Sequence, residues 1–166
     1  MSDAIFSSEQ KIRGRLALRV MSPDNQLVAE REANNMVLRL GAGIIARLFA
    51  GTPDSKPINQ LQVGFGTDAA TAELTALTPP ADTTIPAASL RSALTPASFQ
   101  IATDKPNSIQ VSVTAVFTPD RDLADVTEAG LLAGDELYNQ VVFEPVTLKA
   151  GQNISFFWEI NFPFGH

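Results

Sequence analysis

The sequence predicts a mainly β fold, an antiparallel β-sandwich of jelly-roll or immunoglobulin-like type with one amphipathic helix at about residues 35–50. Large apolar residues occupy alternate positions over several short stretches, most strictly at 109–117 and 154–162. Turn-forming residues separate these stretches at intervals of about 8–12 residues. Apolar residues recur at three- and four-residue spacing in one segment only. At 166 residues the chain fits a single domain, 1–166.

The chain begins with a predicted hairpin. Residues 12–21 alternate well, the sequence Ser-Pro-Asp-Asn at 22–25 supplies turn chemistry, and residues 27–31 form the returning strand. In the first strand the even positions are apolar, and the opposite face carries four basic residues, Lys11, Arg13, Arg15 and Arg19. We interpret these as a solvated face, with a docking surface as the alternative.

The single predicted helix follows. Its ends are indicated by Asn34 or Asn35 as the N-cap and by Gly51 just beyond its last turn. Glycines at 41 and 43 weaken a helix, which predicts close backbone approach to a neighbouring element; a poorly formed helix is the alternative. The apolar stripe consists of Met36, Val37, Leu40, Ile44, Ile45, Leu48 and Phe49.

A strand is predicted at 58–65, ending in the turn Gly-Phe-Gly-Thr-Asp at 64–68. Residues 69–95 are rich in Ala, Thr and Pro, and their prolines exclude a long regular element. We expect an extended arm here, and we expect this arm and the N-terminal segment 1–10 to make inter-subunit contacts. The arm is expected to pack on something because it contains Leu74, Leu77, Ile85, Leu90 and Leu94.

The second half returns to strands. Residues 98–102 and 109–117 form a hairpin, and strands follow at 126–133, 137–143 and 154–162. The last strand points one set of side chains into the core: Ile154, Phe156, Trp158, Ile160 and Phe162. Phe157 points to the opposite face, so its exposure tests whether another element or subunit covers that face.

Composition excludes several classes of function. The net charge of −6 and pI near 4.7 argue against nucleic-acid binding. The absence of cysteine removes disulfides, thiolate nucleophiles and zinc–thiolate sites. Residues 1–10 lack the apolar region of a signal peptide, and no apolar run is long enough to cross a membrane, so we expect a soluble, unexported protein.

No local pattern supports catalysis, a cofactor or a metal, and we assign no residue to such a site. The only histidine is His166, which disfavours a Ser-His pair. The glycine-rich turn at 64–68 lacks the lysine and spacing of a phosphate-binding loop. Paired carboxylates for glycoside hydrolysis stay open because they meet only in space.

Two further groups have alternative interpretations. An acidic cluster could supply oxygen ligands to Ca²⁺, but its spacing misses the EF-hand pattern and favours a solvated loop; it consists of Asp120, Asp122, Asp125 and Glu128. Trp158 and Tyr138 could form a sugar-stacking platform, but Trp158 shares the apolar face of the last strand, which favours core packing.

Several segments together resemble small accessory proteins of tailed bacteriophage particles and the attachment domains of their fibres. The resemblance is one of layout, and it covers most of the chain. Its parts are Asn-Asn-Met-Val at 34–37, Gln-Val-Gly-Phe-Gly-Thr at 62–67, Thr-Glu-Ala-Gly-Leu-Leu at 127–132, Leu-Tyr-Asn-Gln-Val-Val-Phe at 137–143, Gly-Gln at 151–152 and Phe-Phe-Trp-Glu-Ile at 156–160.

The resemblance implies a non-enzymatic virion structural protein, assembled in the host cytoplasm. Such a protein decorates the capsid or collar, or attaches to the neck, baseplate or tail fibre. The implied partners are further copies of this chain, in a homotrimer or other homo-oligomer, and other virion proteins, with no nucleic acid and no membrane. A carbohydrate-binding module that reads a receptor glycan is the alternative, and an enzyme is a third reading.

Overall fold

The computed structural model describes residues 11–68 and 71–165. The N-terminal segment 1–10, residues 69–70 and His166 lie outside the described residues. In chain order the elements are β1 (Arg13–Met21), β2 (Leu27–Val37), α1 (Arg39–Ala50), β3 (Gln60–Gly64), the 3₁₀ helix η1 (Ala87–Leu90), β4 (Arg91–Ala93), the 3₁₀ helix η2 (Pro96–Ser98), β5 (Phe99–Ala102), β6 (Ser108–Phe117), β7 (Leu123–Ala133), β8 (Glu136–Leu137), β9 (Asn139–Leu148) and β10 (Asn153–Pro163).

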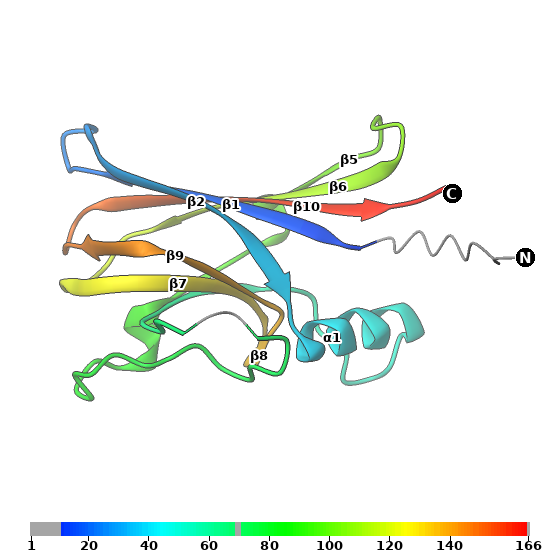
Figure 1. The fold of residues 1–166 in the computed structure, drawn as a ribbon, viewed down its shortest axis with the longest axis horizontal. Coiled ribbons are helices and arrows are strands. Elements are labelled where there is room, and N and C mark those ends of the chain that lie inside the picture. The colour runs from blue at the N-terminus through cyan, green and yellow to red at the C-terminus, as the bar shows by residue number, and fades with distance from the viewer. Residues whose placement is uncertain (1–10, 69–70, 166) are drawn as a thin grey trace, which may run out of the picture.

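All ten strands belong to one antiparallel sheet, in the order β4-β3-β7-β9-β2-β1-β10-β6-β5, with β8 paired to β7. The sheet curls into two facing layers (Figure 1). The β2, β1, β10, β6 and β5 strands form one layer, and β9, β7 and β3 lie in the other. The prediction of a mainly β antiparallel fold with one helix is confirmed. A sandwich of jelly-roll or immunoglobulin-like type is not confirmed, because the strands form one continuous curled sheet.

The two layers join at the end of β2. β2 pairs with β1 along most of its length, but it pairs with β9 only at Asn35–Val37. Where β2 and β9 diverge, the Arg31 guanidinium donates to the backbone oxygens of Glu144 and Pro145, at 2.9 and 2.7 Å. These side-chain hydrogen bonds therefore take the place of some of the backbone hydrogen bonds that β2 and β9 do not form beyond Asn35–Val37.

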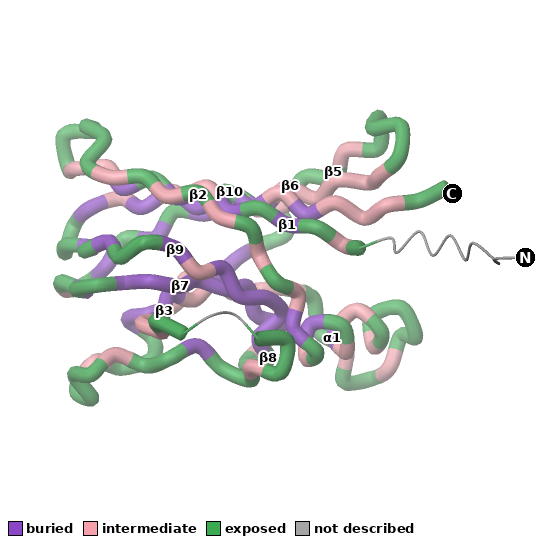
Figure 2. Tube along the Cα trace, in the orientation of Figure 1, coloured by how far each residue is buried: buried purple, intermediate pink, exposed green. Residues whose placement is uncertain are grey.

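The main core lies between the layers and takes side chains from both. The β10 strand supplies Ile154, Phe156, Trp158 and Ile160, each at most 5% exposed, as its alternation predicts. Trp158 pairs with Leu16 of β1 and Val113 of β6, and its ring stacks on Phe156 at 5.7 Å. Figure 2 shows that β7 is buried over most of its length.

The helix is shorter than its sequence predicts. Residues 34–37 belong to β2, whose backbone is paired on both sides at Asn35, so neither Asn34 nor Asn35 is the N-cap. Leu38 takes that position without a side-chain hydrogen bond. The predicted end is confirmed: Gly51 adopts φ 63°, and the amides of Gly51 and Thr52 donate to Leu48 O and Arg47 O.

The described part of segment 69–95 is not a projecting arm. Its leucines pack on this same chain, because Leu77 joins a small core with Leu38, Leu132 and Leu137, while Leu90 and Leu94 enter the main core. Residues Arg91–Ala93 pair with β3 as β4. The expected packing of these leucines is found, and it lies within the same chain; that the segment makes inter-subunit contacts stays a prediction. The other predicted contact, segment 1–10, lies outside the described residues.

Candidate functional site

An apolar cleft of about 130 Å³ opens between α1 and the strands that face it. The helix contributes one wall through Ile44, Ile45 and Leu48. The facing strands β5, β6 and β10 supply the other wall, and residues from the second layer and the loop before β3 close the base. These remaining lining residues are Phe99, Val111, Val113, Ile160, Phe162, Ile58, Leu131 and Tyr138.

The first turn of α1 is held against the backbone at Tyr138. The Leu38 amide donates to the Tyr138 carbonyl oxygen at 3.0 Å. A Cβ at Gly41 would lie 2.0 Å from that same oxygen, so only glycine permits this approach. Gly43 is different, since its nearest neighbour would be the flexible Arg47 side chain at 3.4 Å. The predicted close approach is therefore confirmed at Gly41 and wrong at Gly43.

Exposed apolar side chains lie at the cleft or close to its lining residues in sequence or strand register. On α1, Leu48 is 43% exposed and Phe49 is 94% exposed. Ile101 of β5, 67% exposed, is paired with the lining residue Val111. Phe164, 44% exposed, follows the lining residue Phe162 and donates its amide to Asn107 O. We call the surface formed by these four residues and the cleft the apolar end. Leu48 and Phe49 belong to the predicted helix stripe, but they are not covered within the described chain.

Tyr138 lines the cleft and also carries a buried hydroxyl group. Its side chain is 3% exposed, and its hydroxyl has no hydrogen-bond partner among the described residues. Burial raises the pKa of Tyr138 to about 12, so the phenol stays protonated and can donate a hydrogen bond. The surface of the cleft itself is apolar, so it suits an apolar group.

The acidic residues proposed for Ca²⁺ do not converge. Asp120 accepts from the Ser89 hydroxyl, and Asp122 accepts from the Ala150 amide. Asp125 has a φ of 56° at an irregularity of the β7–β9 pairing, and Glu128 is buried elsewhere. Within residues 11–68 and 71–165, no group of three or more His, Cys, Asp or Glu side chains is arranged to hold a metal.

The buried side chain of Glu128 explains why the turn at 64–68 contains glycines. Its carboxylate, in a residue 1% exposed, accepts from the amides of Gly66 and Thr78 at 3.1 and 2.6 Å and from the Gln140 side chain at 2.7 Å. A Cβ at Gly64 would lie 2.6 Å from Glu128 Oε1. These glycines leave room for a carboxylate that ties the loop to β7. Sequence reasoning placed Glu128 in a solvated loop and missed this role.

The aromatic residues considered for sugar stacking are not available at the surface. Trp158 is 0% exposed and Tyr138 is 3% exposed, which confirms the interpretation as core. Phe157 is 38% exposed on the outer face, beside Arg15, Ala17, Glu32 and Glu159. No described element covers it.

The basic residues of β1 lie on the outer face, as predicted. Arg15 forms an ion pair with Glu32 at 2.8 Å, and Arg19 lies 3.6 Å from Glu30. Both glutamates come from β2, so these two arginines are neutralised by the neighbouring strand. This arrangement fits a solvated face.

A second hollow lies away from the apolar end. It is a wide, open groove of about 970 Å³ next to the start of β7. Its lining includes Phe65, Ile85 and the carboxylates of Asp82, Asp122 and Asp125.

In the described chain, no helix is long and apolar enough to cross a membrane. His166 lies outside the described residues, so its surroundings are not described.

Neither a protein-family model nor a curated protein nor a solved structure matches this chain.

Proposed function

We propose that this chain is a non-enzymatic virion structural protein of a tailed bacteriophage. In this proposal the protein self-associates and docks onto the capsid, neck, baseplate or fibre attachment site. The observation that carries the proposal is the apolar end, where Phe49, Ile101, Phe164 and Leu48 are exposed around an apolar cleft. The likeness in layout to phage accessory proteins supports the class of particle.

The apolar end has the chemistry of a protein–protein contact. Exposed apolar side chains are common singly, but their grouping around one cleft is typical of an interaction surface. Covering a large apolar side chain stabilises a complex by about 1.5–3 kcal/mol before the costs of association. Phe49, 94% exposed, is the best anchor because almost its whole side chain is available.

The oligomeric state tests the self-association part. We expect wild-type protein to form a concentration-dependent oligomer, measured by size-exclusion chromatography with light scattering. Phe49→Asp combined with Ile101→Asp should shift it to the monomer. Leu27→Asp with Val28→Asp is the matched control, because these residues are 54% and 56% exposed in the β1–β2 hairpin at the opposite end (Figure 1). A wild-type monomer at high concentration, or equal effects of both pairs, would contradict the proposal.

Particle association tests the virion part. Mass spectrometry of purified particles from a phage that encodes this chain should detect it in stoichiometric amounts, and cryo-microscopy should place it. The Phe49→Asp/Ile101→Asp protein should be absent or strongly reduced in those particles, while the Leu27→Asp/Val28→Asp protein is incorporated. A protein that never co-purifies with particles would contradict a structural role in the virion.

The glycan-binding alternative has less support, because both aromatic residues considered for a stacking platform are buried. It predicts measurable affinity on a glycan array, and its residues would have to come from elsewhere on the surface. A glycan that binds the wild type and is lost when the groove carboxylates Asp82 and Asp125 are replaced would favour it over the assembly role.

A further inference from the structure

We propose that a shallow hollow beside Phe157, on the outer face of the sheet, is a binding site for one ring of a neutral sugar. The hollow lies on the face of β10 that points away from the core, whereas the apolar cleft is lined by Ile160 from the inner face of the same strand. The inference adds a ligand site to the proposed virion role and stands independently of it.

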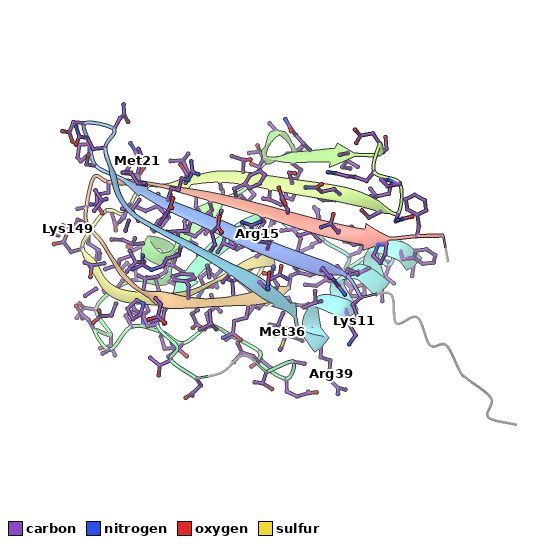
Figure 3. The ribbon with its side chains drawn as sticks, turned by 45° about the horizontal axis from the view of Figure 1, so that its top comes forward. Lys11, Arg15, Met21, Met36, Arg39 and Lys149 are labelled. Atoms are coloured by element: carbon purple, nitrogen blue, oxygen red, sulfur yellow. The ribbon has the colours of Figure 1, made fainter. Side chains whose placement is uncertain are left out.

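The hollow results from the strand register. Phe157 of β10 is paired with Ala17 of β1, and Ala17 is paired with Glu32 of β2. Side chains that are directly opposite on one face have Cβ atoms about 4.5–5.5 Å apart. Because Ala17 carries only a methyl group, it leaves the side of the Phe157 ring uncovered, and a hollow opens there. Figure 3 is turned toward this face and shows Arg15 on β1, between β2 and β10.

The hollow has room for one six-membered ring. Its volume is about 210 Å³, and an apolar cavity of about 150 Å³ holds one benzene molecule. A pyranose is also a six-membered ring and carries hydroxyl groups at its edge. The side chains of Arg15 and Glu32 are 55% and 61% exposed, so hydroxyl groups that the protein does not bind stay in water. The hollow therefore suits a single sugar ring without a closed pocket.

Phe157 provides an apolar surface for the ring. Its side chain is 38% exposed, and no described element covers it. The face of an aromatic ring is negative and attracts weakly positive hydrogens. One face of a pyranose carries several C–H groups, so this face can lie on the phenyl ring and remove apolar surface from water. A ligand that covers Phe157 therefore needs an apolar face of its own.

The polar side chains of the lining match hydroxyl groups in both directions. The Arg15 guanidinium can donate, and the carboxylates of Glu32 and Glu159 can accept. Arg15 and Glu32 hold each other at 2.8 Å, so both planar groups are positioned before a ligand arrives. Glu159 is paired with Arg15 in the strand register, but its carboxylate has no ion-pair or hydrogen-bond partner within the described residues. Its oxygens are available to a ligand.

The charges of the lining favour a neutral ligand with many hydroxyl groups over an ion. An anion would be repelled by the two glutamates, and a cation would be repelled by Arg15. A sugar hydroxyl both donates and accepts, so one ring can use the guanidinium and the carboxylates together. Thr114, paired with Phe157 on the side of β6, adds an exposed hydroxyl.

Nuclear magnetic resonance titration of the full chain with glucose, galactose, mannose and N-acetylglucosamine tests the site. We expect at least one of these sugars to shift the backbone amide signals of Ala17 and Phe157. Phe157→Ser, which removes the ring, should weaken this binding at least ten-fold, and so should Ala17→Leu, which fills the hollow. The control Val116→Ser, 57% exposed on the same face but outside the hollow, should leave the affinity within two-fold of wild type.

Four results would overturn the inference. The first is that none of the four sugars shifts these signals, and the second is binding that survives both Phe157→Ser and Ala17→Leu. The third is binding that is lost in Asp82→Asn/Asp125→Asn instead, which would place the sugar in the groove beside β7. The fourth is a response to tetramethylammonium without a response to any sugar, which would make the hollow a cation site. The near-ultraviolet signal of Trp158 confirms that each variant is folded.

Discussion

Glu128 joins three separate parts of the chain through one buried carboxylate. It accepts from the amides of Gly66 and Thr78 in the loop after β3 and from Gln140 of β9. The amide nitrogen of Gln140 donates to Glu128 and its amide oxygen has no partner, so rotation of the amide group by half a turn would let that oxygen accept from a glutamine at position 128. The side chain therefore matters chiefly as an acceptor for two buried backbone amides.

Two substitutions at this position should differ sharply. Glu128→Gln should cost less than about 1 kcal/mol of unfolding free energy, because an acceptor remains and Gln140 can rotate. Glu128→Leu should cost about 2–6 kcal/mol, because two amides lose their acceptor. Urea unfolding measures both, with exposed Glu144→Ala as the control. Equal losses for the two variants would show that the charge, rather than the acceptor, is what matters.

Tyr138 should make stability depend on alkaline pH. Burial raises its pKa from 10.0 to about 12, so the folded protein favours the neutral phenol. The neutral Tyr138 phenol therefore contributes to the unfolding free energy fully below about pH 10, and this stabilisation is lost as the pH rises through about 12. Between about pH 8 and pH 11, wild type should lose on the order of 1 kcal/mol more unfolding free energy than Tyr138→Phe.

The Tyr138→Phe variant also tests the state of the hydroxyl. At neutral pH the variant should be as stable as wild type or more so, if the hydroxyl has no partner in the full chain. A hydroxyl that does have a hydrogen-bond partner would instead make the substitution destabilising. Urea unfolding at neutral pH distinguishes these outcomes.

At the level of single residues, alternation along the strands predicted the interior well. Trp158 and Phe156 are buried as predicted, and Phe157 points outward. The role of Glu128 was not predictable, because its partners lie 62, 50 and 12 residues away in the sequence. A buried carboxylate satisfied by backbone amides has no local sequence pattern.

Substitution of Trp158 tests the predicted core through the free energy of unfolding. Trp158→Ala should cost about 3–5 kcal/mol, because the ring is fully buried and stacked on Phe156. Phe157→Ala, one residue along on the outer face, should cost much less. Denaturant unfolding of the two variants measures the difference, and similar losses would mean that the outer face is also covered.

Alanine substitutions at the two glycines of α1, Gly41 and Gly43, test how closely this helix packs against the backbone at Tyr138. Gly41→Ala places a Cβ 2.0 Å from the Tyr138 carbonyl oxygen, so the helix must move and stability should fall by more than about 2 kcal/mol. Gly43→Ala meets no rigid neighbour and should stabilise by up to about 1 kcal/mol. Thermal unfolding checks both, and a neutral Gly41→Ala would contradict the close approach.

Most elements were predictable, but the start of the helix was not. The strand at β10 and the hairpin at β5–β6 lie where the alternation placed them. The helix start was wrong because pairing of Asn35 with β1 and β9 keeps residues 34–37 in β2. Asn34 and Asn35 could have capped a helix locally, but backbone pairing with residues of β9, over a hundred positions away, keeps this segment in a strand instead.

The whole sheet could not be predicted from the sequence, because strand order depends on contacts far apart in the chain. The clearest case is segment 69–95, whose composition suggested an arm. Its leucines instead fill cores beside β3, β7 and α1, and β4 and β5 form the two ends of the strand order although only residues 94–98 separate them. The apolar cleft was missed for the same reason, since its lining residues come from α1, from the loop before β3, from Tyr138 and from four strands, β5, β6, β7 and β10.

Deletion of residues 71–94 should therefore abolish folding of the whole molecule. The deletion removes β4 and the buried side chains of Leu77, Leu90 and Leu94. We expect loss of the cooperative unfolding transition and of the near-ultraviolet signal of Trp158, measured by circular dichroism. A folded monomer after this deletion would instead restore the interpretation of the segment as an arm.

The position of β10 also sets an order for folding during synthesis. This strand is the last of the described strands to leave the ribosome, yet it lies between β1 and β6 in the finished sheet. Until it emerges, the β1–β2 hairpin has no partner along β1, and the edge of β6 is likewise open. Nascent chains that stop before residue 153 should present two unpaired strand edges and aggregate, whereas release of the next eleven residues closes both edges at once.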